Sequence, residues 1–173
     1  LIDNGKITAY NISIGQLFNG QIHGSTVTVK GPNAELNAVN DQFVLRGDLN
    51  LGLATLRIED GALASAKEIV VGANRGYDSH LIATGPGSRV VSNWLSVGTD
   101  LGSRSTLVIE NGAALTTTNE ARIGDGYMPD QADKLHFKAT VTGNNSRWDI
   151  TNALTLNGDL VVLVGGGVNV GSV

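Results

Sequence analysis

The chain lacks cysteine entirely, and only 16% of its 173 residues are charged, against a typical share of about a quarter. Without cysteine there is no disulfide, thiolate ligand or cysteine nucleophile. No apolar run approaches the length needed to cross a bilayer as a helix, so the sequence predicts no membrane-spanning helix. The net charge of −4 and the scattered Lys and Arg residues argue against a nucleic-acid groove, which requires clustered basic residues.

Glycine is abundant instead, at 23 of 173 residues, nearly twice its usual share of roughly 7%. Several glycines recur regularly: Gly47, Gly72, Gly98 and Gly124 are almost equally spaced, and Gly158 follows after a longer interval. Self-similarity with a period of about 20 to 50 residues is typical of solenoids and repeat arrays. We therefore interpret the chain as a repeat protein.

Each repeat contains short apolar segments rich in Val, Ile, Leu and Thr and bounded by Gly, Asn or Asp, a pattern typical of strands. Residues 55–72 and 106–124 share one pattern, and 83–98 and 140–158 are a variant in which a Gly-x-x-Ser turn replaces Asp/Asn-Gly-Ala. No window shows a sustained helical pattern, and the leucine-rich repeat motif is absent. The prediction is an all-β, right-handed parallel β-helix of three strands per turn and about six rungs, with 1–173 as one segment.

In such a stack, equivalent side chains lie above one another about 4.8 Å apart and form ladders. Ile58 and Ile109 are predicted to point inward, and Arg57 is predicted to point outward. Two further ladders are expected from the repeat alignment: Leu56, Leu81 and Leu107; and Val71, Val97 and Ile123. Both chain ends fall inside a repeat, so the sequence is expected to be part of a longer protein.

Residues 125–138 form an insertion that is longer than the neighbouring joints between repeats. Loops that extend from one face of a solenoid often carry the binding function. Tyr127, Met128, His136 and Phe137 are therefore candidate binding residues, since they are costly to expose unless they meet a partner or fold back on the stack. A tolerated surface insertion without a function is the alternative.

Arg46-Gly47-Asp48 matches the tripeptide that many integrins read through a guanidinium and a metal-bound carboxylate. Arg46 and Asp48 are therefore candidate binding residues. However, residues 156–160 (LNGDL) repeat residues 45–49 (LRGDL), so a structural turn explains the Gly-Asp pair equally well.

The sequence offers no catalytic residue, metal ligand or cofactor site. No G-x-S-x-G motif is present. Three aspartates in the insertion lack calcium-loop spacing, and the histidines lack the spacing of a zinc site; these residues are Asp125, Asp130, Asp133, His23, His80 and His136. Trp94 and Trp148 are expected to pack at corners of the stack, with stacking against a sugar as the alternative.

The alternation of G-x-L-x-I-x-N-G-A…I-G with V-T-G-x-x-S-x-W…L-x-V-G resembles the passenger domains of bacterial autotransporters, especially the AIDA-like adhesins and self-associating members. The resemblance rests on Thr55–Gly72, Gly85–Gly98, Thr106–Gly124 and Gly143–Gly158, including Trp148. It implies export through the periplasm and outer membrane, to the bacterial surface or into the medium. It also implies a signal peptide upstream and a membrane β-barrel downstream.

The resemblance favours a virulence-associated adhesin or self-association module, active in autoaggregation and biofilm formation, rather than an enzyme. Its expected partners are a protein or glycan on a host cell or neighbouring bacterium, or a second copy, with no nucleic acid. Polar side chains on flat strand faces are expected to make these contacts, namely Thr116, Thr117, Thr118 and Asn119. The alternatives are a secreted ligand for a host receptor and a polysaccharide-degrading β-helix enzyme.

Overall fold

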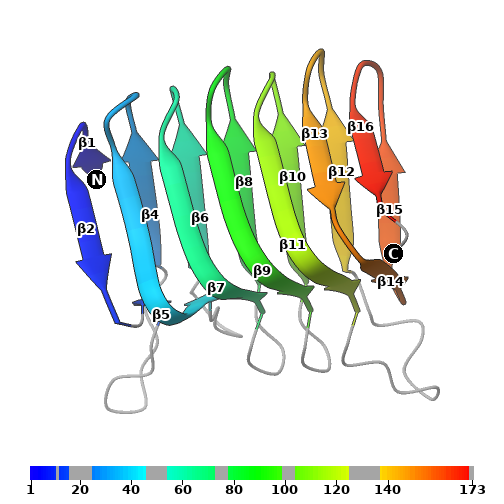
Figure 1. Ribbon diagram of the computed structural model, residues 1–173, viewed down its shortest axis with the longest axis horizontal. Helices are drawn as coiled ribbons and strands as arrows, with labels where there is room; N and C mark the ends of the chain where they lie inside the picture. The colour runs from blue at the N-terminus through cyan, green and yellow to red at the C-terminus, as the bar shows by residue number, and fades with distance from the viewer. Residues whose placement is uncertain are drawn as a thin grey trace.

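A computed structural model describes residues 1–10, 12–15, 25–45, 54–72, 78–98, 104–124 and 137–171, except for the side chains of 40–45. Within these ranges all regular secondary structure is β-strand, which confirms the all-β prediction. Strands from successive rungs lie side by side along one long axis, and the N- and C-terminal strands lie at opposite ends of the stack (Figure 1).

The strands form two sheets in which every pairing is parallel. The first sheet contains, in spatial order, β1 (Ile2–Asp3), β4 (Ser25–Lys30), β6 (Ala54–Glu59), β8 (Ser79–Thr84), β10 (Ser105–Glu110), β12 (Lys138–Thr142) and β15 (Asp159–Val162). The second contains β16 (Gly167–Val170), β13 (Arg147–Ile150), β11 (Ala114–Ile123), β9 (Arg89–Val97), β7 (Leu63–Val71), β5 (Glu35–Leu45) and β2 (Lys6–Ala9). The chain alternates between the sheets, as a solenoid does.

The long strands of the second sheet bend. The pairing register of β11 shifts between Thr117 and Glu120, and that of β5 shifts between Ala38 and Gln42. Beyond the bend, β14 (Ala153–Leu156) pairs with β11 and β3 (Ile12–Ile14) pairs with β5. Figure 1 shows the lower ends of the long strands curving away from the sheet.

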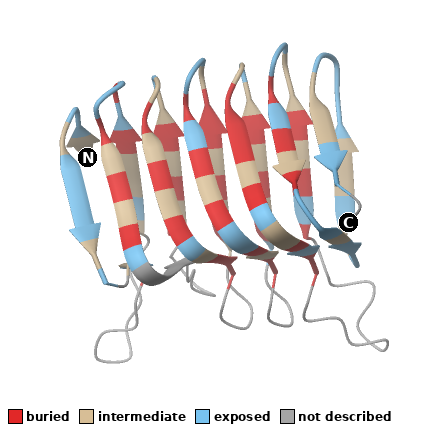
Figure 2. Ribbon diagram, viewed as in Figure 1, coloured by how far each residue is buried: buried red, intermediate tan, exposed pale blue. Residues whose placement is uncertain are grey.

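The predicted ladders are confirmed. Leu56, Leu81 and Leu107 are consecutive partners in the first sheet, and all three are fully buried. Val71, Val97 and Ile123 are consecutive partners in the second sheet and are also buried. Buried residues alternate with more exposed ones along the central strands (Figure 2), because strand side chains point to opposite faces in turn.

The spacing inferred from the terminal glycines is wrong at both ends of the stack. Leu45 pairs with Val71, and Ile123 pairs with Leu156, so the residues that follow these ladder positions are Arg46 and Asn157 rather than Gly47 and Gly158. The Asn157 amide donates to the Ile123 carbonyl at 2.7 Å, the same bond that Gly124 makes to Val97 at 2.8 Å. The bond needs only a backbone amide, and Asn157, unlike Gly98 and Gly124, does not have a positive φ, so glycine is not required at position 157.

The alternation of turn types has a hydrogen-bonding cause. Asp60 and Gly61 both have positive φ, 54° and 87°, as in a type I′ turn, and the Ala62 amide closes the turn by donating to the Glu59 carbonyl at 3.2 Å. The Gly61 amide donates to the hydroxyl of Ser88 in the next rung at 3.0 Å, and the Gly112 amide donates to Ser146 at 2.9 Å. Both serines are buried. The serine of each Gly-x-x-Ser turn thus satisfies the glycine amide of the Asp/Asn-Gly-Ala turn before it.

Replacing Ser88 with alanine should therefore lower the free energy of unfolding by about 1–3 kcal/mol, since the Gly61 amide loses its acceptor. Ser146→Ala should have a similar effect through Gly112, whereas Ser88→Thr keeps a hydroxyl for the bond. Urea denaturation followed by circular dichroism measures the change. Unaltered stability in both alanine variants would contradict this account of the turns.

Trp148 lies in the core, as predicted for a corner tryptophan, with no exposed surface. Its Nε1–H donates to the Thr117 Oγ1 at 3.1 Å, and Thr117 is itself fully buried. The prediction that Thr117 lies on a contact face is therefore wrong: it points inward and satisfies the indole. Its ladder neighbour Ser92 has a buried Oγ with no hydrogen-bond partner, the sole such side-chain atom in the described ranges.

Thr117→Val should cost about 1–3 kcal/mol, because it preserves shape but leaves the buried Trp148 indole N–H without an acceptor. Ser92→Ala is the matched comparison: it removes an unsatisfied hydroxyl and should be neutral or stabilising. Thermal melting of both variants tests the pair. Equal destabilisation by the two substitutions would show that the Trp148–Thr117 bond contributes nothing.

Candidate binding site

Most of the predicted binding residues lie outside the described residues, namely Tyr127, Met128, His136, Arg46 and Asp48. Their roles remain predictions. One structural observation supports the interpretation of the Arg-Gly-Asp tripeptide as part of a repeated turn. Leu45 and Leu156, each two residues before the glycine of a Gly-Asp pair, belong to the same ladder. Asp159 then begins strand β15 directly.

Phe137 is described, and it is only 1% exposed. A Cβ built on Gly98 would overlap its ring, and one built on Gly124 would lie 3.0 Å from it, so the ring fills space left by the absence of side chains there. The prediction that Phe137 is an exposed binding residue is wrong, because its side chain packs in the core of the stack. The local sequence did not reveal this, because the two glycines are distant in the chain.

The predicted insertion, 125–138, is too long at its C-terminal end. Lys138 begins strand β12, where it pairs with Thr106 and with Asp159. The Phe137 carbonyl accepts a hydrogen bond from the Asp159 amide at 2.9 Å, so Phe137 is also part of the stack. Phe137 and Lys138 therefore belong to the stack rather than to the insertion.

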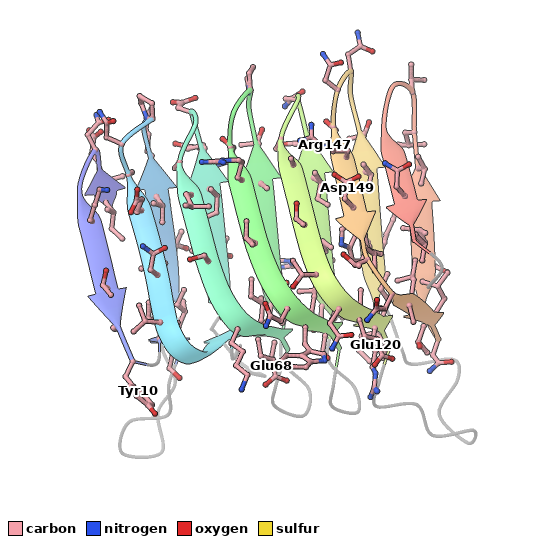
Figure 3. The ribbon with its side chains drawn as sticks, viewed as in Figure 1. Tyr10, Glu68, Glu120, Arg147 and Asp149 are labelled. Carbon is pink, nitrogen blue, oxygen red and sulfur yellow. The ribbon has the colours of Figure 1, made fainter. Side chains whose placement is uncertain are left out.

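The described surface contains a different candidate site, on the part of the second sheet beyond its bend. Glu68 of β7 pairs with Trp94 of β9, and Trp94 pairs with Glu120 of β11, so the three occupy one ladder across three rungs. Their side chains are half-buried or exposed, whereas the next residue on each strand is buried, as alternation requires. Glu68 and Glu120 lie along the curved lower ends of the strands in Figure 3.

This ladder lines a cleft of about 360 Å³. Trp94 is 37% exposed, although it is a large aromatic residue. The lining residues, together called the Trp94 cleft, are Lys67, Glu68, Trp94, Leu95, Ser96, Glu120 and Arg122. The cleft thus combines an aromatic surface with carboxylates, cations and a hydroxyl, a set suited to binding a polar ligand with an apolar face.

Charged groups in the cleft hold one another in place. Arg122 donates to Glu120 through Nε at 2.9 Å and Nη2 at 3.1 Å, and Thr155 Oγ1 adds a longer contact of 3.5 Å. The hydrogen bond from Arg122 is the largest cause of a lowered Glu120 pKa, and partial desolvation opposes it. Glu120 is therefore ionised at neutral pH and accepts hydrogen bonds. Lys67 Nζ lies 5.8 Å from the Trp94 ring centroid, within cation–π range.

A shallow groove of about 620 Å³ adjoins the Trp94 cleft, and Lys67 lines both. Its side chains are mainly small or polar: Asn37, Ala38, Val39, Ser65, Ala66, Lys67, Val91 and Asn93. Ser65 Oγ donates to Asn37 Oδ1 at 2.7 Å, and Thr118 Oγ1 donates to Asn93 Oδ1 at 3.1 Å. Hydrogen bonds between rungs thus order this surface.

A third hollow, of about 320 Å³, lies over the first sheet and contains His80. His80 Nδ1 is 2.6 Å from Thr106 Oγ1, and burial lowers the pKa of the imidazole, although Asp78 opposes this. His80 is therefore neutral at pH 7. In the ranges the structure describes, no three histidine or acidic side chains group closely enough to hold a metal ion. Asp125, Asp130 and Asp133 lie outside those ranges.

No family model, no curated protein and no solved structure matches the chain. The autotransporter resemblance therefore remains an interpretation of the sequence motifs. The described residues include no helix of the length and apolarity needed to span a membrane.

Trp94 was a candidate from the sequence, but the residues around it were not. The alignment of the repeats contains the pattern that identifies them. Lys67-Glu68-Ile69, Asn93-Trp94-Leu95 and Asn119-Glu120-Ala121 occupy equivalent places in three successive repeats. Aligning them places an aromatic residue between two glutamates on one surface.

Proposed function

We propose that this chain is an adhesion or self-association module of the autotransporter-passenger type, displayed on a bacterial surface or secreted. We further propose that its stack is a right-handed, three-stranded β-helix, with the segment beyond the bend as the third strand of each rung. The separate strands β3 and β14, which pair only beyond the bend, support three strands per rung. The motif alternation supports the passenger class.

The observation that carries the function is the continuous surface formed by the Trp94 cleft and its adjoining groove. The strands behind it pair with neighbours on both sides, so the side chains are held before any partner arrives. A preorganised surface loses little conformational entropy on binding. Small, polar and aromatic groups in register over several rungs provide many contacts for a protein or glycan surface.

The test uses a triple variant, Lys67→Ala, Asn93→Ala and Trp94→Ala, on bacteria or beads that display the chain. Wild-type chains should cause aggregation or adhesion to host cells, and the variant should lose most of it while keeping its β-sheet spectrum and melting temperature. A matched triple on the first sheet, Thr28→Ala, Lys138→Ala and Thr140→Ala, is the control. Full adhesion by the folded cleft variant would overturn the proposal.

A polysaccharide-cleaving enzyme has weaker support. The cleft does contain two carboxylates, Glu68 and Glu120, and most glycoside hydrolases use a pair of carboxyl groups. A general acid, however, needs a raised pKa, and the hydrogen bonds from Arg122 lower that of Glu120. The alternative of a receptor ligand depends on residues 46–48 and 125–136, outside the described residues.

A further inference from the structure

We propose that the Trp94 cleft binds an uncharged sugar unit of a glycan, with the sugar ring stacked on the indole. The inference rests on the proposed adhesion function and names the chemistry of the partner. It follows from the aromatic surface, from the groups on either side of it, and from the balance of charge.

The aromatic surface is placed for stacking. Trp94 occupies a ladder position where the preceding and following rungs carry glutamate, and the residue remains 37% exposed. Trp148, by contrast, is fully buried and uses its N–H in the core. An exposed indole offers a flat apolar face that matches the C–H face of a pyranose ring.

The flanking groups suit the hydroxyl rim of the same ring. Glu68 and Glu120 lie one rung to either side of Trp94, at a rung spacing of about 4.8 Å. A carboxylate has about four lone-pair sites, so each of the two can accept hydrogen bonds from sugar hydroxyl groups in addition to the interactions that it already makes. Arg122 orients Glu120 through two bonds, and the Ser96 hydroxyl, which also lines the cleft, can donate or accept.

The charge balance favours a neutral ligand. Two carboxylates and two cations line the cleft, and one cation, Arg122, is already bonded to Glu120. An acidic sugar would bring a third carboxylate next to Glu68 and Glu120. A cationic ligand would compete with Lys67, which already lies over the indole. A neutral ring adds no charge to the cleft, and to stack on the face that Lys67 covers it displaces only the Nζ, 5.8 Å from the ring centroid. A volume of about 360 Å³ accommodates a ligand of this size.

The test measures binding of the purified chain to a panel of neutral and acidic oligosaccharides, including gluco-, galacto-, manno- and N-acetylglucosamine oligomers and sialylated and uronic-acid oligomers. The chain has only two tryptophans, and Trp148 is buried, so changes in tryptophan emission on titration report mainly on Trp94. The variants are Trp94→Ala, Trp94→Tyr, Glu68→Gln and Glu120→Gln. Arg147→Ala is the control, exposed on β13 well away from Glu120 (Figure 3).

We expect at least one neutral oligosaccharide to bind, and Trp94→Ala to raise its Kd by at least about tenfold. Trp94→Tyr should retain most of the affinity, each glutamine variant should weaken it, and Arg147→Ala should not change it. Binding of acidic oligosaccharides alone would overturn the proposal. If no oligosaccharide binds but the cleft triple variant still loses adhesion, the sugar inference falls and the adhesion function stands. If adhesion also survives in that variant, both fall.

Discussion

Gly98→Ala should lower the free energy of unfolding by about 2–5 kcal/mol, because two independent penalties add at this position. Gly98 has a φ of 77°, where a Cβ is strained, and the added methyl group would overlap the Phe137 ring. Phe137 is only 1% exposed, so the overlap must be relieved by a shift of the ring or of the backbone. Urea denaturation followed by circular dichroism measures the loss.

A double-mutant cycle separates the two penalties. Phe137→Ala alone should cost about 3–5 kcal/mol through the cavity that it leaves. In that background the overlap is absent, so Gly98→Ala should cost only the backbone strain, about 1–2 kcal/mol. An equal cost for Gly98→Ala in both backgrounds would mean that Phe137 does not pack against Gly98.

Ile58→Asp should be the other severe variant, with a loss of more than about 3 kcal/mol from burying an unpaired carboxyl group. Ile58 is fully buried in a ladder between Val29 and Ala83. A carboxylate there would have no described polar partner and must either remain charged in an apolar core or take up a proton. Thermal melting and tryptophan emission should both show a destabilised or unfolded chain.

The matched control is Arg57→Gln, one residue away on the outer face. Arg57 is 39% exposed and its Nε lies 2.7 Å from Glu59, and such surface ion pairs contribute about 0–1 kcal/mol. Glutamine is preferred to aspartate at this position, because aspartate would place a second carboxylate beside Glu59. Comparable melting shifts in Ile58→Asp and Arg57→Gln would refute the register, because a one-residue slip exchanges the two faces of a strand.

The parallel stack and its inner ladders could be predicted because both depend on local pattern and period. Alternating apolar residues fix which side chains of 55–59 and 106–110 point inward, and the repeat spacing places Leu56, Leu81 and Leu107 on one ladder. The alternation of the two turn types could also be recognised in the sequence, although the hydrogen bond that explains it could not. The bond from Gly61 to Ser88 crosses between rungs, and a single sequence does not display such contacts.

The candidate site depended on tertiary structure. Thr117 was predicted to face solvent, because threonine occurs on both faces of strands. In the structure its buried hydroxyl instead accepts a hydrogen bond from the indole of Trp148 in the following rung. In the sequence, Phe137 lies at the end of a long insertion and was predicted to be exposed. It is buried because its ring fills the space over Gly98 and Gly124.

By itself, the sequence determined a β-solenoid with defined inward positions, because period and alternation are properties of one strand and its repeats. Only the tertiary structure decided which outward positions share a cleft. Glu68, Trp94 and Glu120 belong to three successive repeats and meet because parallel pairing stacks them rung by rung. Lys67 precedes Glu68 in β7, and Arg122 lies two residues after Glu120 in β11, so the same stacking brings both cations into one hollow.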